Sequence, residues 1–327
     1  MGTLAVVPKP TFFSGRNGEC RLDRKPRARF IMTTLPRGRF APSPTGRLHF
    51  GSLVAALGSW LSARAAGGRW IVRIEDVDRE REVPGAAGAI LATLDAFGLE
   101  SDEPVVRQSE RGHLYAEALD RLAADGHAYR CWCSRSDLEP FGGIHPPACV
   151  APPAARPPAW RVRVQGAVVG FDDAIQGAQV QDLAREVGDF VAWRADGAWA
   201  YQLAVVVDDA AQGVTEVVRG ADLLDSTPRQ ILLQRLLALP QPRYAHLPLA
   251  LDADGRKLSK HAAALPVDAG EPLPALRAAL RFLGQPVPDA RNVRELLSAA
   301  AAGFDAGRVP RANAAPPAFA ALRKDVC

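Results

Sequence analysis

The chain has 327 residues and a formal charge of +4, with 40 Lys and Arg against 36 Asp and Glu. Apolar residues make up 48% and charged residues 23%, a balance that excludes a disordered or collagen-like chain. The length suffices for about two domains with a buried core. No apolar stretch approaches the ~20 residues that a membrane-spanning helix needs, so we expect a soluble cytoplasmic protein without a membrane partner.

The beginning of the chain is more basic than the rest. Residues 1–31 hold seven basic and two acidic side chains and lack the apolar core of a secretory signal. This segment is rich in Arg, Pro and Gly and shows no period, so we expect residues 1–34 to form a mobile basic arm. Met32 directly precedes the first patterned segment, and one interpretation is that translation starts there. The other interpretation is an arm that binds nucleic acid.

The first patterned segments predict a βαβ unit. Residues 37–41 form a short strand that leads into a Pro-Ser-Pro-Thr-Gly turn, and apolar residues recur at helical spacing from Leu53 to Leu61. Residues 70–74 are a compact apolar run typical of a buried parallel strand, which ends at Glu75. Loops at the carboxyl ends of such strands form the ligand sites of open α/β sheets.

The later segments alternate between helical and sheet patterns around a Pro-rich stretch. In chain order we predict helices at about 84–98 and 109–125, an insertion over 127–170, strands at 201–207 and 213–218, a helix that begins near Ser226-Thr227-Pro228, a last strand at 247–251, a turn at 252–255 and an Ala-rich helical end. Because strands and helices alternate on both sides of the insertion, the fold class is α/β.

The motif with the most chemical content is Arg-Phe-Ala-Pro-Ser-Pro-Thr-Gly-Arg-Leu-His-Phe-Gly-Ser-Leu, residues 39–53. A turn rich in Pro and Gly lets the backbone approach a phosphate chain, and the helix after it presents N–H groups and a positive dipole end. His49 is placed to donate a hydrogen bond to phosphate. The complete run predicts a nucleotide site, and the chain has no P-loop motif that would indicate a P-loop phosphotransferase.

A second basic motif, Lys257-Leu258-Ser259-Lys260, follows the last predicted strand. In isolation it would fit a solvated basic loop equally well. Beside the nucleotide site that the first motif predicts, a mobile lysine can neutralise charge that grows on a phosphate; the resemblance named below implies that this is the α-phosphate, as pyrophosphate leaves.

Four side chains near the predicted cleft suit a dicarboxylic amino acid. Arg39 and Arg219 can each pair with a carboxylate in the bidentate manner, and either arginine could hold either carboxylate. Glu75, at the end of its strand, is placed to accept the α-ammonium group, whereas Glu75-Asp76-Val77-Asp78 taken alone would better fit a solvated acidic turn. Tyr201 could donate its hydroxyl to a carboxylate.

Three cysteines and one histidine have the spacing of a metal site. Cys131-x-Cys133, His145 and Cys149 supply four soft or borderline ligands, as tetrahedral Zn²⁺ requires. Because protein fills all four positions, the predicted zinc is structural. A chain that is not exported keeps its thiols reduced, which favours metal over disulfides, and the alternative is a set of buried unpaired cysteines.

These motifs together resemble the class I aminoacyl-tRNA synthetases, in the form found in the glutamyl group. Ser52 stands where the general first motif has a second histidine. The resemblance implies a Rossmann-like catalytic domain that binds ATP with Mg²⁺. It assigns catalysis to His49, Lys257 and Lys260, ATP binding to Pro42, Ser43, His49, Gly51, Ser52 and Lys260, and glutamate binding to Arg39, Phe40, Ala41, Pro42, Ser43, Glu75, Tyr201 and Arg219.

The cysteine cluster and the 67 residues after Lys260 narrow the resemblance. From about Arg37 to its end the chain is most similar to a family of truncated paralogues, the glutamyl-queuosine tRNA(Asp) synthetases. The resemblance implies activation of L-glutamate by ATP without tRNA, then transfer of glutamate to the queuosine base in the anticodon of tRNA(Asp). At His145 some of these relatives have tyrosine, and histidine is the better zinc ligand.

This interpretation divides the chain into segments and leaves alternatives. We expect half of the catalytic domain at 35–105, an acceptor-binding insertion with the zinc site at 106–198, the other half at 199–263, a helical tail without an anticodon-binding domain at 264–327, and a monomer. The alternatives are a discrete glutamyl-tRNA synthetase that charges a tRNA 3′ end, a non-catalytic tRNA-binding paralogue, and an enzyme that passes activated glutamate to a protein or small molecule.

Overall fold

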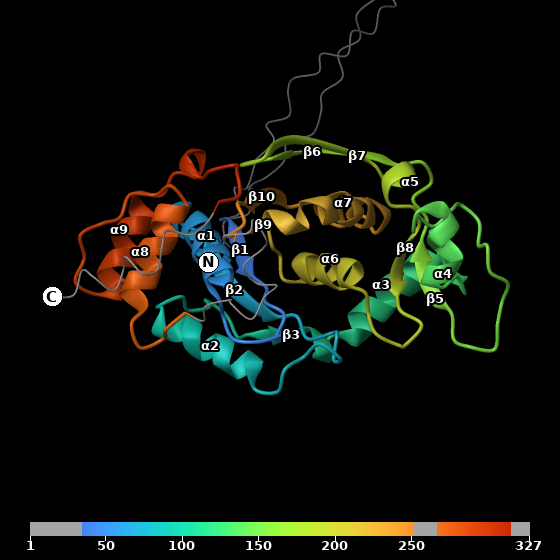
Figure 1. Cartoon of the computed structure of the whole chain (residues 1–327), viewed down its shortest axis with the longest axis horizontal. Coiled ribbons are helices and arrows are strands. Elements are labelled where there is room, and N and C mark those ends of the chain that lie inside the picture. Colours follow the sequence, from blue (N-terminus) through green and yellow to red (C-terminus); the bar gives the residue numbers. More distant parts are fainter. Residues whose placement is uncertain (1–34, 252–266, 315–327) are drawn as a thin grey trace, which may run out of the picture. The chain divides into compact units, whose positions relative to one another are not determined.

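The structure is a computed structural model that describes residues 35–251 and 267–314 (Figure 1). The predicted arm at 1–34, the turn at 252–255 and the two lysines of the second motif lie outside these residues. Within the described ranges, none of the helices has both the length and the apolar character needed to cross a bilayer.

The predicted βαβ unit is confirmed. Strands β1 (Arg37–Phe40), β2 (Arg69–Ile74) and β3 (Val106–Arg107) form a parallel sheet in that order, and helix α1 (Phe50–Ala65) connects the first two. All of β2 except Arg69 is buried, as expected for a strand covered on both faces. The turn after β1 and the residue after β2 therefore lie at the same edge of the sheet.

A second sheet continues these parallel strands. Its strands β9 (Glu216–Gly220) and β10 (Arg243–Leu247) pair in parallel. With β6 (Val168–Asp173) and β7 (Gly177–Asp182) the strand order is β7-β6-β10-β9. Next to β9, the Thr215 backbone N–H donates to the Arg37 carbonyl (3.0 Å) and the Arg37 N–H donates to Thr215 Oγ1 (2.8 Å). Because these bonds join the start of β9 to β1, the carboxyl ends of β1, β2 and β9 surround one region.

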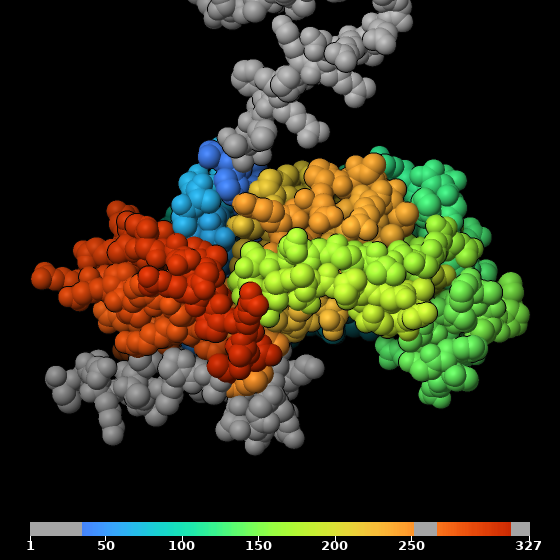
Figure 2. Space-filling model, turned by 90° about the horizontal axis from the view of Figure 1, so that it is seen from above, coloured from blue at the N-terminus to red at the C-terminus, as the bar shows by residue number. Residues whose placement is uncertain are grey.

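The middle of the chain contributes to two sheets. Strands β4 (Ala128–Cys131), β5 (Ala159–Val162) and β8 (Phe190–Trp193) form an antiparallel sheet of their own. The hairpin β6–β7 (Val168–Asp173 and Gly177–Asp182) instead pairs with β10. Figure 2 shows this hairpin in yellow-green along the surface, beside the orange helix α7. The domain boundaries at 106 and 198 stay a prediction.

Two buried hydrophobic clusters hold the elements together. The first joins α1 to β1, β2 and the C-terminal helices, with Phe50 and Phe282 in an edge-to-face contact at 5.8 Å between ring centroids. The second lies among α3, α6, α7 and the strands beside them, with Tyr115, Leu203 and Ile231 fully buried. Packing of this kind is the main stabilising term of the fold.

The remaining elements are α2 (Ala86–Ala96), η1 (Gln108–Glu110), α3 (Gly112–Ala124), α4 (Arg135–Leu138), η2 (Glu139–Phe141), α5 (Leu183–Glu186), α6 (Tyr201–Ala211), η3 (Ala221–Ser226), α7 (Thr227–Leu236), α8 (Pro272–Phe282), α9 (Val293–Ala302) and η5 (Ala306–Arg308).

Two predictions about local structure were wrong. Residues 201–207 belong to helix α6 rather than a strand, since a buried helix shows the same continuous apolar run as a buried strand. The last predicted strand, at 247–251, is β10 and ends at Leu247. The helix predicted to begin near Ser226-Thr227-Pro228 is confirmed: α7 begins at Thr227, directly after the 3₁₀ helix η3, and the Ser226 side chain makes no capping bond.

Candidate active site

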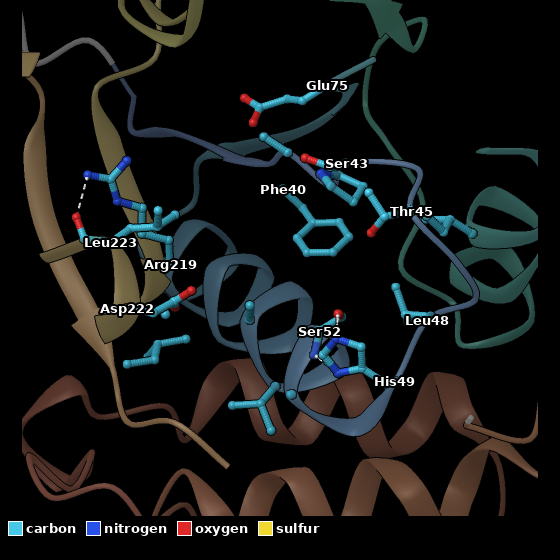
Figure 3. Close-up of a pocket in the computed structure, with 18 of the residues that line it drawn as sticks. Phe40, Ser43, Thr45, Leu48, His49, Ser52, Glu75, Arg219, Asp222 and Leu223 are labelled. Carbon is cyan, nitrogen blue, oxygen red and sulfur yellow. Dashed lines mark hydrogen bonds between the residues drawn. The ribbon is translucent and has the colours of Figure 1, made fainter. Parts of the chain in front are cut away.

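One cavity of about 870 Å³ lies at the carboxyl ends of β1, β2 and β9 (Figure 3). Its wall includes every described residue that the sequence assigned to ATP or glutamate: Arg39, Phe40, Ala41, Pro42, Ser43, His49, Gly51, Ser52, Glu75, Tyr201 and Arg219. Segments far apart in the sequence thus meet around one space. Lys257 and Lys260 lie outside the described residues, and their roles stay predictions.

The first motif forms one end of the cavity, where His49 and Ser52 hold each other (Figure 3). The Ser52 backbone N–H donates to His49 Nδ1 (3.2 Å), and His49 Nε2 lies 2.9 Å from Ser52 Oγ. Because Nδ1 accepts, a neutral ring carries its proton on Nε2 and donates it to Ser52 Oγ. A Cβ on Gly51 would lie 3.3 Å from the His49 ring, so glycine suits this close approach. The start of α1, with its positive dipole end, therefore borders the cavity.

Arg39 forms part of the wall and is almost completely buried. Its Nε donates to Asp209 Oδ1 at 3.3 Å, and its exposed fraction is 2%. Among the described residues no hydrogen-bond partner occurs for its two terminal nitrogens. The end of the guanidinium is thus available to a carboxylate in the cavity, while Asp209 fixes the Nε edge.

Arg73 connects this arginine to Glu75. Arg73 Nη2 donates to Asp209 Oδ1 (2.8 Å) and to Glu75 Oε1 (3.1 Å), and the side chain is fully buried. Burial raises the pKa of Glu75, and the attraction of Arg73 and Arg39 offsets only part of that rise. Burial also acts to raise the pKa of Asp209, but the charges of Arg39 and Arg73 outweigh it and hold that pKa below its usual range.

The same ionic network extends from the cavity toward the middle segment of the chain. Asp208 is fully buried and accepts hydrogen bonds from Gln108 Nε2 (2.8 Å) and the Tyr115 hydroxyl (2.6 Å), and Arg111 pairs with it. Our sequence analysis did not identify Arg73, Asp208 or Asp209. The signal was present, because a charged residue inside an apolar run requires a buried partner.

Arg219 and Tyr201 supply another wall. Arg219 lies near the end of β9, and its Nη1 donates to the hydroxyl of Tyr201, the first residue of α6 (3.2 Å). In Figure 3 Arg219 lies to one side of Phe40, with Glu75 and His49 at opposite ends of the view. Two buried arginines and one carboxylate around a single cavity have the charges needed to bind an amino acid with two carboxylates.

The predicted metal ligands come together away from this cavity. Ligand atoms of Cys131, Cys133, His145 and Cys149 all lie within 4.8 Å of one another. His145 Nε2 is 3.2 Å from Cys131 Sγ, and Nδ1 is 2.6 Å from the Pro146 carbonyl oxygen. The carbonyl therefore fixes the proton on Nδ1 and leaves Nε2 directed at the thiols, which is the arrangement of metal-binding histidines.

Comparisons with known proteins agree on one class. Residues 37–142 and 154–298 match the family described as tRNA synthetases class I (E and Q), catalytic domain. The chain therefore belongs to this family of class I tRNA synthetases.

Individual relatives show which members of this family the chain is similar to. The chain is 61% identical over 278 residues to a glutamyl-Q tRNA(Asp) synthetase of Xanthomonas oryzae pv. oryzae, which covers 84% of this chain and 92% of that protein. A glutamyl-Q tRNA(Asp) synthetase of Ectopseudomonas mendocina is 54% identical over 288 residues, or 86% of this chain and 97% of the relative. A crystal structure of a glutamate tRNA ligase from Elizabethkingia meningosepticum, in complex with its amino acid, superposes with a TM-score of 0.72 at 26% identity, over 87% of this chain and 68% of the other.

Proposed function

We propose that this chain is a ligase that activates L-glutamate with ATP and then transfers the glutamyl group to the queuosine base in the anticodon of tRNA(Asp). The observation that carries the first step is the single cavity in which the first motif adjoins Arg39, Glu75 and Arg219. The names of relatives at 54–61% identity, matched over nearly their whole length, support the acceptor.

Activation needs few chemical groups beyond those that position the substrates. Arg39 and Arg219 hold the two carboxylates, and the oxygen of Glu75 that faces away from Arg73 accepts the α-ammonium. The α-carboxylate of glutamate then attacks the α-phosphate in line, and pyrophosphate leaves. Lys257 and Lys260 neutralise the charge that develops, and His49 lies where it can hydrogen-bond a phosphate. Mg²⁺ bound together with ATP would add positive charge at the phosphates. Catalysis therefore comes from positioning and electrostatic stabilisation. This step proceeds without tRNA.

Substitution of Lys260, the last residue of the second motif, tests the activation step directly. Lys260→Ala should lower the rate of adenylate formation by about a hundredfold or more, as loss of one stabilising charge does, and leave glutamate binding unchanged. Rapid-quench kinetics and equilibrium glutamate binding measure the two quantities separately. Unchanged activation kinetics would contradict the role of Lys260.

A second cavity, of about 640 Å³, provides a route for the acceptor. It shares Ser43, Thr45, Glu75, Arg81 and Tyr201 with the first cavity. Other side chains, such as Arg161 and Trp199, line its remaining walls. An acceptor hydroxyl that enters here would reach the carbonyl carbon of glutamyl-adenylate, with AMP as the leaving group. Arginine and tryptophan are side chains that contact nucleotide phosphates and bases.

The fold similarity to a glutamate tRNA ligase favours a second candidate, a discrete glutamyl-tRNA synthetase that charges a 3′ end. Radiolabelled glutamate offered to an anticodon stem-loop of tRNA(Asp) separates the two, because this fragment has no acceptor stem. We expect label on the stem-loop that carries queuosine and none on the same stem-loop with guanine. Label confined to the 3′ adenosine of intact tRNA would overturn the proposal.

We further propose that Cys131, Cys133, His145 and Cys149 bind one structural Zn²⁺. The donor set and its separations fit a closed tetrahedral site. Burial and the neighbouring thiols raise the pKa of Cys149 to about 12, whereas a divalent cation would favour the thiolate. Binding of zinc should therefore release protons. Calorimetry in buffers of different ionisation enthalpy measures that release, and zinc uptake without it would contradict a thiolate site.

A further inference from the structure

Arg219 is held by an unusually complete set of hydrogen bonds. Its Nε donates to His246 Nε2 (3.1 Å), and its Nη2 donates to Thr227 Oγ1 (2.9 Å) and the Leu223 carbonyl (3.3 Å). With the bond from Nη1 to Tyr201, four of the five guanidinium N–H groups have partners. The fifth belongs to Nη1, the nitrogen beside Tyr201, which itself lines the glutamate cavity.

The partner of Nε has to be a neutral histidine. His246 has no exposed surface, and its Nδ1 lies 2.6 Å from Asp173 Oδ2. Since Nε2 receives a proton from Arg219, the histidine's own proton has to reside on Nδ1, where Asp173 accepts it. The other tautomer would place two N–H donors face to face. Burial lowers the pKa of His246, and the positive charge of Arg219 acts in the same direction.

Asp173 is itself locked in place by the backbone. Its Oδ1 accepts from the N–H groups of Ile175 (3.0 Å), Gln176 (2.8 Å) and His246 (3.1 Å), so Oδ2 has a fixed direction toward the imidazole. Burial acts to raise its pKa, but the hydrogen bonds from His246 and the backbone outweigh it and keep the carboxylate ionised. The chain of contacts thus runs from β6 through β10 to Arg219 on β9.

We propose that Asp173 and His246 are positioning residues for glutamate recognition: Asp173 fixes the tautomer of His246, and His246 fixes the plane of the Arg219 guanidinium so that Nη1 faces the substrate. This inference rests on the proposed binding of glutamate by Arg219. It assigns to the β6–β7 hairpin, which lies on the surface in Figure 2, a direct connection to the amino-acid pocket.

Two substitutions at His246 separate positioning from mere packing. Glutamine places its side-chain oxygen where Nε2 stands and can accept from Arg219, whereas leucine fills a similar volume without an acceptor. In tRNA-free pyrophosphate exchange we expect His246→Leu to raise the KM for glutamate about ten- to hundredfold and leave the KM for ATP within about twofold. His246→Gln should restore most of the glutamate KM.

Asp173→Asn provides an independent variant that keeps the histidine. Its amide N–H₂ group can donate to Nδ1, which would transfer the histidine proton to Nε2 and oppose Arg219. We expect the KM for glutamate to rise as much as in His246→Leu. The ¹⁵N spectrum of the labelled protein should show a changed tautomer of His246. Arg243→Gln, at an exposed position on the same strand as His246, is the control and should change neither KM.

The outcomes are distinct. A wild-type protein without glutamate-dependent exchange would overturn the proposed function, and the positioning role with it. If the wild type is active but His246→Leu and Asp173→Asn keep the wild-type glutamate KM, or if glutamine behaves like leucine, the positioning role is wrong. Should the leucine variant fail to fold, the glutamine and Asp173→Asn variants still decide between the two results.

Discussion

The cavity at the carboxyl ends of β1, β2 and β9 and the cysteine–histidine cluster are built in opposite ways. The cavity lies at the ends of parallel strands, and its charged side chains are fixed by buried partners on neighbouring elements. Arg73, for example, contacts both Glu75 and Asp209. Among the described residues, the buried apolar group around the cluster is small: Cys131, Cys133 and Leu138, with the partly buried Tyr129 and Ala151 packed against them. A site fixed by a core is formed before its ligand arrives, whereas a site with so little core depends on its metal for structure.

The largest expected effect comes from breaking the buried network of the cavity. Arg73→Met leaves Glu75 and Asp209 without their shared cation and should lower the free energy of unfolding by about 3–5 kcal/mol. Denaturant titration measures this loss. The control is Arg69→Ala on the same strand. The Arg69 side chain is 64% exposed and pairs with Glu103, so its loss should cost less than about 1 kcal/mol. Equal losses in the two variants would contradict the structural role of the network.

Removal of the metal should affect the cluster alone. With a strong chelator we expect hydrogen exchange to accelerate in residues 131–149 and in the strands paired with them, while β1, β2 and α1 keep their protection. Glutamate activation should fall by less than about twofold, and transfer to tRNA should be lost. If the chelator unfolds the parallel strands as well, the two regions are not independent.

Substitution of a glycine beside His145 tests the metal affinity of the cluster without changing a ligand residue. Gly188 has a φ of +70°, and a Cβ there would lie 2.3 Å from the His145 carbonyl oxygen. Gly188→Ala should therefore displace His145 and weaken zinc affinity about 10- to 100-fold. Gly197→Ala is the matched control, since its φ is +86° but no atom lies within 4 Å of the added Cβ. Competition with a chromophoric chelator compares the two, and equal affinities would contradict the contact.

The smallest expected effect is on pH dependence. Glu75 can accept the α-ammonium only when ionised, and its pKa is raised by burial. As pH falls through that raised pKa the carboxylate gains a proton, so the KM for glutamate should rise, about tenfold per pH unit at the limit. Glu75→Gln should bind glutamate weakly with a flat profile over the same range. A wild-type profile that stays flat down to the ordinary range of glutamic acid would show that Glu75 has no such role.

Local patterns were enough to predict the βαβ unit, the first motif and the cysteine–histidine cluster, because each lies within a short stretch of the chain. Tyr201 and Arg219 lie far from the first motif, and the family resemblance was needed to assign them to the same site. The network that fixes the cavity could not be assembled in this way, since Arg73 and Asp209 are 136 residues apart and pair only through the fold. For residues 201–207 the apolar run identified a buried segment but not its conformation. The roles of His49, Lys257 and Lys260 stay predictions.

The proposed function depends on activation of glutamate by this chain without tRNA. Glutamate-dependent ATP–pyrophosphate exchange without tRNA tests it most directly, with aspartate and glutamine as controls. The account predicts exchange with glutamate and far less with either control, because two arginines have to be satisfied by two carboxylates at the correct separation. Exchange that appears only when tRNA is added would favour a conventional glutamyl-tRNA synthetase. No exchange by folded, zinc-loaded protein would contradict the proposed activity altogether.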